Sequence, residues 1–143
     1  MSAFTVHASI EGNLTADPIL RNTASGMAVA NFRVAVTSRS AVGNGEFRET
    51  TQYVPVVAWR DLGTNAAASL AKGTRVTVSG DMKQRKYTNA EGNDVYIQEL
   101  HADSIGISLR WHVVPAGAIT KAKDALVPAD MDSVPFPEEQ LAA

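Results

Sequence analysis

The sequence lacks cysteine altogether, which excludes a disulfide framework and any metal site built on thiolates. It also lacks an apolar run that approaches the roughly 20 residues needed to cross a membrane. Residues 1–7 contain neither the basic segment nor the apolar segment of a secretory signal. We therefore expect a cytoplasmic protein that does not engage a membrane.

Signatures of catalysis and of metal binding are missing as well. The three histidines, His7, His101 and His112, lie far apart without ligand spacing, which favours surface histidines over metal ligands. Ser69 and Lys72 match an S-x-x-K nucleophile motif, but the S-D-N and K-T-G elements that accompany it in some hydrolases are absent. Neither a phosphate-binding loop nor a G-x-S-x-G elbow occurs. We expect no catalytic residue, no metal and no cofactor, with a hydrolase built on Ser69 and Lys72 as a remote alternative.

Neither positive nor negative charge is in large excess, since the formal net charge is -2. The charges are nevertheless uneven along the chain. Residues 1–112 carry 11 Lys and Arg against 10 Asp and Glu, whereas residues 113–143 carry 2 Lys against 5 acidic residues. A slightly basic body with an acidic appendage fits a nucleic-acid module, although this charge balance alone is weak evidence.

Alternation of apolar and polar residues is the main structural signal. In residues 28–38 the even-numbered positions from Ala30 to Val36 are expected in the core, and the odd-numbered positions from Val29 to Thr37 are expected outside. The same pattern predicts five strands, at about 5–13, 28–38, 47–60, 74–88 and 95–109, the last with a bend near 102–104.

One segment has helical character. In residues 61–72, Leu62, Ala66 and Leu70 recur every four residues, and Gly73 is the residue expected after the helix end. Three strands before one helix do not alternate as strand-helix-strand units, which disfavours a parallel sheet. We expect an all-β fold: a small antiparallel barrel of five strands with one short helix between strands 3 and 4.

The character of the chain changes after Trp111, because four of the six prolines lie beyond it and apolar periodicity is poor there. We expect residues 1–112 to form one folded domain and residues 113–143 to form a flexible acidic tail. Trp111 itself is expected to cap the barrel or to take part in an interface.

Aromatic and basic residues occur together in three places in the sequence. Such a combination is typical of proteins that bind single nucleic-acid strands, because the rings stack on bases while the cations contact the phosphates. Tyr53 and Trp59 share one face of the third predicted strand, and Val54 and Val56 occupy the other. The valines favour the core, which leaves the two rings exposed. The reverse orientation, with both rings in the core, stays open.

The remaining candidates are two further aromatics and a set of cations near the predicted rings. A charge run or a surface ring is often no more than a solvated face, and that alternative stays open for each of them. The candidate platforms are Phe47 and Tyr87, and the candidate cations are Arg33, Arg48, Arg60, Lys83, Arg85 and Lys86.

An ordered set of motifs resembles the bacterial single-stranded DNA-binding protein (SSB) family. The motifs occur in the family's order from about residue 10 to residue 107, and this ordered set is specific. The matching pieces are Gly12-Asn13-Leu14 with Asp17-Pro18 and Arg21, Ala30-Asn31-Phe32 with Val34-Ala35-Val36, Val56-Val57-Ala58-Trp59, Leu70-Ala71-Lys72-Gly73 with Val76, Val78 and Gly80, and Arg85-Lys86-Tyr87-Thr88 with Gly92.

The resemblance implies an OB-fold barrel, a homotetramer, and sequence-independent binding of single-stranded DNA in replication, recombination or repair. By matched position, the stacking aromatics are Tyr53, Trp59 and Tyr87. The matched contacts to the DNA backbone are Arg21, Arg33, Arg85 and Lys86.

Two departures leave an alternative function open. Residues 40–42, Ser-Ala-Val, stand where many family members carry an aromatic, and Pro55 stands where a polar or basic residue is frequent. Both favour an OB-fold interaction subunit of a replication or repair complex with weak DNA binding.

Residues 130–136 resemble the acidic tip of the family, which recruits replication and repair proteins. In the family the final Phe is normally terminal, whereas residues 137–143 follow here. A merely solubilising tail therefore stays open beside the expected partner-binding residues, which are Asp130, Asp132, Pro135 and Phe136.

Overall fold

The computed structural model describes residues 5–122, which form six strands, one α-helix and one short 3-10 helix. One strand more than expected is present, namely the separate four-residue strand β2 (Ile19–Asn22). The elements are β1 (Val6–Leu14), β2 (Ile19–Asn22), β3 (Ala28–Gly43), β4 (Glu46–Trp59), α1 (Arg60–Ser69), β5 (Arg75–Thr88), β6 (Asp94–Ile107) and the 3-10 helix η1 (Ala116–Ala118).

Five of the strands close into a barrel. They follow the order β1-β5-β6-β4-β3, and β1 pairs again with β3 through Asn13 opposite Ala35 and Leu14 opposite Val34. The expectation of a mostly stranded fold with a closed five-stranded barrel and one helix is confirmed, and the arrangement is consistent with an OB-type barrel. Strand β2 lies outside this ring and pairs only with β3 among the described strands.

The prediction of a wholly antiparallel barrel is wrong at one place. Strands β4 and β6 run parallel, with Val56 opposite Leu100 and Val57 opposite His101. The reason is topological: α1 separates β4 from β5, and β5 pairs with β1 instead of β4. Because β3 and β5 both run antiparallel to β1, their hairpin partners β4 and β6 run in the same direction.

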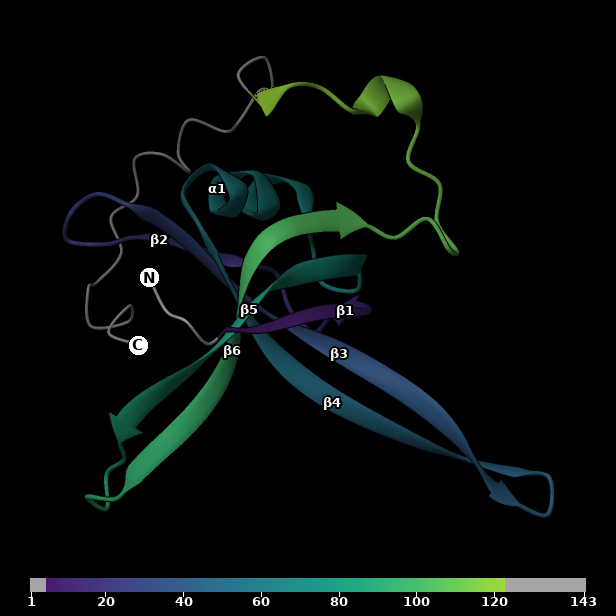
Figure 1. The fold of residues 1–143 in the computed structure, drawn as a ribbon. Helices are drawn as coiled ribbons and strands as arrows, with labels where there is room; N and C mark the ends of the chain where they lie inside the picture. Colours follow the sequence, from purple (N-terminus) through teal and green to yellow (C-terminus); the bar gives the residue numbers. More distant parts are fainter. Residues whose placement is uncertain (1–4, 123–143) are drawn as a thin grey trace.

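Two hairpins extend from the barrel as long arms, β3–β4 in blue and β5–β6 in green (Figure 1). The first arm turns through residues 43–45, where Asn44 adopts a left-handed φ of 55° between two glycines. The second arm turns near Gly92. The bend expected near residues 102–104 is a β-bulge, since Ser79 pairs with Ser104 and Gly80 with Ala102.

The core fills the inside of the barrel with the residues that the alternation places there, including Phe32, Val34 and Val56. One part of that prediction is wrong, because Val29 is buried although its position points outward. Val29 lies in register between Arg21 on β2 and Trp59 on β4, whose longer side chains flank it. The core cluster consists of Leu14, Phe32, Val34, Val56, Ala66, Leu70, Val76, Val78 and Leu100.

Helix α1 is shorter than expected and ends at Ser69 instead of Lys72. The prediction that Gly73 follows the helix end is therefore wrong. The chain is already extended at Leu70, with φ -109° and ψ 150°. Gly73, with φ 90°, instead forms the turn into β5. No helix within residues 5–122 is long and apolar enough to cross a membrane.

Side chains explain why the helix stops early. The N–H of Ala71 donates to Oγ1 of Thr74 at 3.2 Å, and the N–H of Lys72 donates to Oδ1 of Asp17 at 2.8 Å. These acceptors replace the helical carbonyls that would otherwise receive the two N–H groups. The Asp17 of the family motif therefore fixes the connection between α1 and β5.

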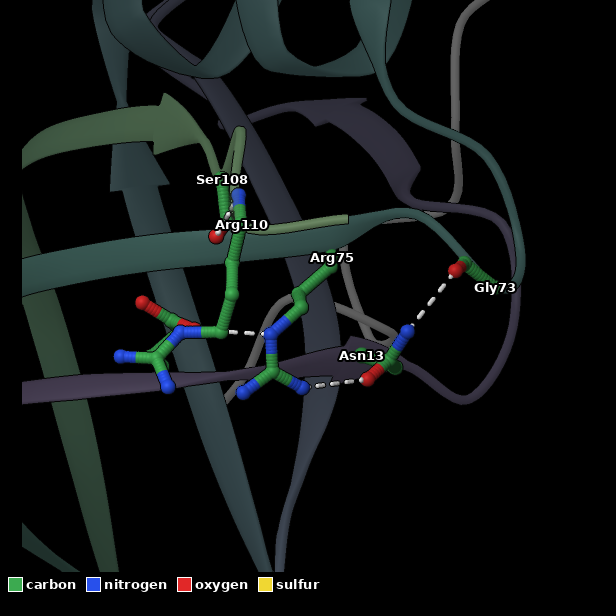
Figure 2. Close-up of polar contacts among 6 residues, drawn as sticks. Asn13, Gly73, Arg75, Ser108 and Arg110 are labelled. Carbon is green, nitrogen blue, oxygen red and sulfur yellow. Dashed lines mark hydrogen bonds and ion pairs between the residues drawn. The ribbon is translucent and has the colours of Figure 1, made fainter. Parts of the chain in front are cut away.

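The Gly-Asn-Leu motif at residues 12–14 lies where β1 closes the barrel. A Cβ on Gly12 would lie 2.2 Å from the carbonyl oxygen of Ala35, so only glycine allows this approach. The Asn13 side chain donates to the carbonyl of Gly73 and accepts from Nη1 of Arg75, both at 3.0 Å (Figure 2). Asn13 thus ties the end of β1 to the beginning of β5.

Candidate nucleic-acid interface

Besides Phe47 near its start, strand β4 carries two exposed rings that point away from the core. Tyr53 is 60% exposed and Trp59 is 38% exposed, while Val56 on the opposite face is buried. The open alternative, in which both rings lie in the core, is therefore wrong. The even spacing of Tyr53 and Trp59 along the strand places both on the same outer face.

Strand register extends this outer face across the neighbouring strands, because directly opposed residues share a face. Arg33 on β3 lies opposite Pro55, between the positions of Tyr53 and Val57. His101 on β6 lies opposite Val57 on β4 and opposite Asp81 on β5.

The next residues on the same side of β5 are cationic and aromatic. Lys83 lies opposite Glu99, and alternation carries the same face through Arg85 to Tyr87, which is 40% exposed. We call this surface the aromatic face, and it consists of Arg33, Tyr53, Trp59, Lys83, Arg85 and Tyr87.

A chain of polar contacts joins two rings of the aromatic face. The indole N–H of Trp59 donates to Nδ1 of His101 at 3.2 Å, and Nε2 of His101 lies 3.5 Å from Oε1 of Glu99. The other carboxylate oxygen of Glu99 accepts from Nε of Arg85 at 3.2 Å. The Arg85 guanidinium lies 5.9 Å from the centre of the Tyr87 ring, within the range of a cation–π contact.

The surroundings of His101 favour its neutral form. Burial is the largest cause of a lowered His101 pKa, and the positive charge of Lys83 acts in the same direction. The carboxylates of Glu99 and Asp81 oppose this shift without cancelling it. Neutral imidazole is also the form that can accept the Trp59 hydrogen bond at Nδ1.

The candidate cations are not equivalent in the structure. Arg33, Arg48, Arg60 and Lys83 are exposed. Arg60 has a left-handed φ of 60°, an uncommon conformation for a residue with a side chain, directly after Trp59.

Three other cations have more restricted positions. Arg21 lies partly buried on β2, opposite Val29. Arg85 bonds the buried Glu99. Lys86 lies on the other side of the β5–β6 ribbon, where its Nζ is 3.2 Å from Asp94. The structure therefore does not bring Lys86 together with Lys83.

Phe47 lies far from the other candidate rings. It is 62% exposed near the tip of the β3–β4 arm, and Arg39 places its guanidinium 5.0 Å from the ring centre. At about 3.3 Å per residue, the separation of Phe47 from Trp59 along β4 is about 40 Å. Phe47 can serve as a platform only for a strand that follows the arm outward.

Sequence reasoning missed several residues near these surfaces. Tyr96 is exposed opposite Lys86, on the other side of the ribbon from Tyr87. Its position in an alternating strand was a usable signal. Glu99 and His101 were missed as partners of Arg85 and Trp59, because their contacts depend on register between strands that are distant in sequence.

Trp111 lies under the guanidiniums of two arginines. The Arg75 guanidinium is 4.4 Å from the ring centre and that of Arg110 is 5.6 Å away. The ring nevertheless stays largely exposed, so it covers Arg75 and does not seal the barrel.

One group of side chains within residues 5–122 could ligate a cation. Ligand atoms of His7, Asp81 and Asp103 lie within 4.8 Å of one another. Nδ1 of His7 is already 3.0 Å from Asp81, and the His7 side chain is mostly exposed. This geometry is that of a solvated surface hydrogen bond with a neighbouring carboxylate, which spacing in the sequence could not reveal.

Comparison with known proteins assigns this chain to a family. The sequence model of the "Single-strand binding protein family" matches residues 6–108, which include all six strands and α1. This chain belongs to that family. The ordered motifs that resembled the SSB family are thereby accounted for.

Individual relatives within the SSB family agree. A "Single-stranded DNA-binding protein" of Paenarthrobacter nicotinovorans is 45% identical over 105 residues, which cover 72% of this chain and 62% of that protein. "Single-stranded DNA-binding protein 1" of Tropheryma whipplei (strain Twist) is 41% identical over 122 residues, covering 84% of this chain and 66% of that protein. The chain thus spans less than two thirds of the length of these relatives.

A solved structure of similar shape also carries that name. The crystal structure of a small single-stranded DNA-binding protein from Streptomyces coelicolor superposes with a TM-score of 0.63 at 32% identity. The match covers 74% of this chain and 96% of that one. The expected tail residues Asp130, Asp132, Pro135 and Phe136 lie outside the described residues.

Proposed function

We propose that this chain binds and protects single-stranded DNA without choosing among base sequences, in replication, recombination or repair. The observation that carries the proposal is the aromatic face, where Tyr53 and Trp59 on β4 and Tyr87 on β5 stand outward on the two strands that flank β6. Every base offers a flat π-face, so exposed rings can stack on any sequence. Phe47 is a fourth platform for DNA that follows the β3–β4 arm.

Stacking carries more of the binding than charge in this proposal. Each stacked base is worth roughly 1–3 kcal/mol, whereas residues 1–112 have nearly balanced charge. Cations then follow the phosphates and make binding depend on salt. The proposed phosphate contacts are Arg21, Arg33, Arg48, Arg60, Lys83, Arg85 and Lys86, and we assign Lys86 a smaller part because of its position on the ribbon.

A titration with single-stranded and double-stranded oligonucleotides tests the proposal. Stacking on Trp59 is expected to quench its fluorescence with single strands, and the duplex is expected to have little effect. A Trp59→Phe control assigns the signal, because the chain also contains Trp111. Equal binding of both forms would contradict base stacking.

A second function is favoured by one observation. Two of the proposed phosphate contacts already bond acidic side chains, Arg85 with Glu99 and Lys86 with Asp94. This pairing favours an OB-fold interaction subunit of a replication or repair complex that binds DNA weakly. The same titration separates the two functions, since an interaction subunit would show no saturable change with single strands near physiological salt.

The proposal also covers the type of barrel, the bounds of the DNA-binding domain and the number of copies in the assembly. We propose that the barrel is of the OB type, that residues 1–112 are the DNA-binding domain, and that the chain assembles as a cytoplasmic homotetramer. The barrel with α1 between β4 and β5 supports the fold assignment, and membership of the SSB family supports the tetramer. Sedimentation equilibrium of the full chain measures the number of copies.

We also propose that residues 113–143 recruit replication and repair proteins. The support is the acidic character of this segment and its resemblance to the tip of the family at Asp130, Asp132, Pro135 and Phe136. A pull-down of purified replication and repair proteins, with the full chain and with a chain lacking residues 130–143, tests it. Identical capture by both forms would end this part of the proposal.

A further inference from the structure

We propose that His101 is a positioning residue that holds the Trp59 ring ready for a base and releases it when His101 becomes protonated. The inference rests on the proposed function, because it concerns how a stacking ring is kept in place. The observation behind it is the chain of contacts from Trp59 through His101 and Glu99 to Arg85.

The direction of the first hydrogen bond fixes the state of the imidazole. An indole N–H can only donate, so Nδ1 of His101 must accept and cannot carry a proton. The proton of the neutral ring then lies on Nε2, which faces Oε1 of Glu99 at 3.5 Å. Glu99 is itself buried and held from its other side by Arg85, so it orients the His101 ring.

The arrangement leaves part of Trp59 exposed to an incoming base. Trp59 and His101 lie nearly parallel, with an interplanar angle of 22° and ring centres 6.4 Å apart. The edge of Trp59 that carries the N–H is bonded, yet 38% of the residue stays exposed. A ring fixed in this way loses little conformational freedom when it binds, which is the advantage of a preorganised contact.

Protonation reverses the first contact. A protonated imidazole carries N–H groups on both nitrogens, so Nδ1 would present a donor to the donor of Trp59. The charged groups around His101 are Glu99 on β6 and Asp81 and Lys83 on β5, while β4 contributes the uncharged Trp59. Burial and Lys83 together hold the pKa of His101 below its ordinary value of about 6.5. Release is therefore expected only in mildly acidic solution.

The experiment follows the Trp59 indole N–H by NMR in the full chain carrying Trp111→Phe, which leaves a single indole. The same protein is titrated with a thymidine oligonucleotide between pH 7.5 and a pH well below 6. As His101 titrates, we expect the indole resonance to move and the affinity to fall about twofold to tenfold, the range set by one net hydrogen bond.

Two variants separate positioning from a merely structural role. His101→Asn keeps an oxygen that can accept from Trp59 but does not titrate. Its affinity for the oligonucleotide at pH 7.5 should therefore stay within about twofold of the original protein. Neither the indole resonance nor the affinity should then change with pH in the range where His101 titrates. His101→Leu removes the acceptor and should show the weaker affinity at every pH. His112→Asn, at an exposed histidine outside these contacts, is the matched control and should keep the original profile.

Each outcome decides the inference. A His101→Asn protein with the original pH profile would overturn it, as would an indole resonance that does not move while His101 titrates. If His101→Leu does not fold, the His101→Asn profile still decides. If no form binds the oligonucleotide, the proposed function fails, and the indole resonance still reports on the contact between Trp59 and His101.

Discussion

The carboxylate of Glu11 accepts a 2.7 Å hydrogen bond from Nε of Arg75, although the two residues lie 64 positions apart in the sequence. The same carboxylate oxygen lies 3.6 Å from Nε of Arg110, so the segment after β6 also meets β1 here. The Arg75 hydrogen bond is the main cause of a lowered Glu11 pKa, and burial works against it. The charges of Arg75 and Arg110 lower it further.

This contact predicts a loss of stability in acid. Because the folded Glu11 pKa lies below its unfolded value of about 4.5, the contribution is complete above that pH and is lost as pH falls through the folded pKa. Glu11→Gln should therefore lower the free energy of unfolding at pH 7, and the difference from the original protein should shrink as the pH falls through the folded pKa, measured by urea denaturation. Glu49→Gln is the matched control, because its pair with Arg39 is well exposed and should contribute little at either pH.

A second prediction concerns the closing of the barrel at Gly12. Gly12→Ala should destabilise the fold by about 1–3 kcal/mol, since the added Cβ would meet the backbone of Ala35 and force β1 away from β3. Urea unfolding measures the change. Gly117→Ala is the control, because no heavy atom lies within 4 Å of the added Cβ there. Equal stability of both variants would show that β1 can shift without cost.

The parts of the fold that follow from local pattern could be predicted from the sequence. Alternation alone assigned Phe32 and Val34 to the core, and the valines at 54 and 56 favoured the outer face for Tyr53 and Trp59, where the structure has them. These assignments need only the two-residue period of a strand. The aromatic platforms were therefore within reach of the sequence, and their use in DNA binding stays a prediction.

Features that depend on pairing between distant strands could not be predicted. The parallel contact of β4 with β6 sets Val57 opposite His101, and only that register brings His101 to Trp59. The early end of α1 has a similar origin, because Asp17 reaches Lys72 from a distant loop. A helix propensity cannot anticipate such a tertiary acceptor.

The aromatic face predicts where aromatic substitutions matter. Trp59→Ala and Tyr87→Ala should each weaken binding to single-stranded DNA by about 1–3 kcal/mol, and equally for thymidine-rich and mixed sequences, because stacking does not read base edges. Tyr96→Ala is the matched control from the opposite side of the β5–β6 ribbon. Fluorescence anisotropy of labelled oligonucleotides measures all three, and a loss confined to one base type would contradict stacking.

The last prediction separates two lysines by the salt dependence of binding. Lys83 is exposed on the aromatic face, whereas Lys86 lies on the other side of the ribbon beside Asp94. Each phosphate neutralised on a single strand contributes about 0.7 to the slope of log affinity against log salt concentration. Lys83→Ala should therefore reduce the slope by about 0.7, and Lys86→Ala should reduce it less. Titrations of both variants at several salt concentrations measure the slopes. A larger change for Lys86 would mean that DNA passes over the opposite side of the arm, and the path assigned to the strand would have to move there.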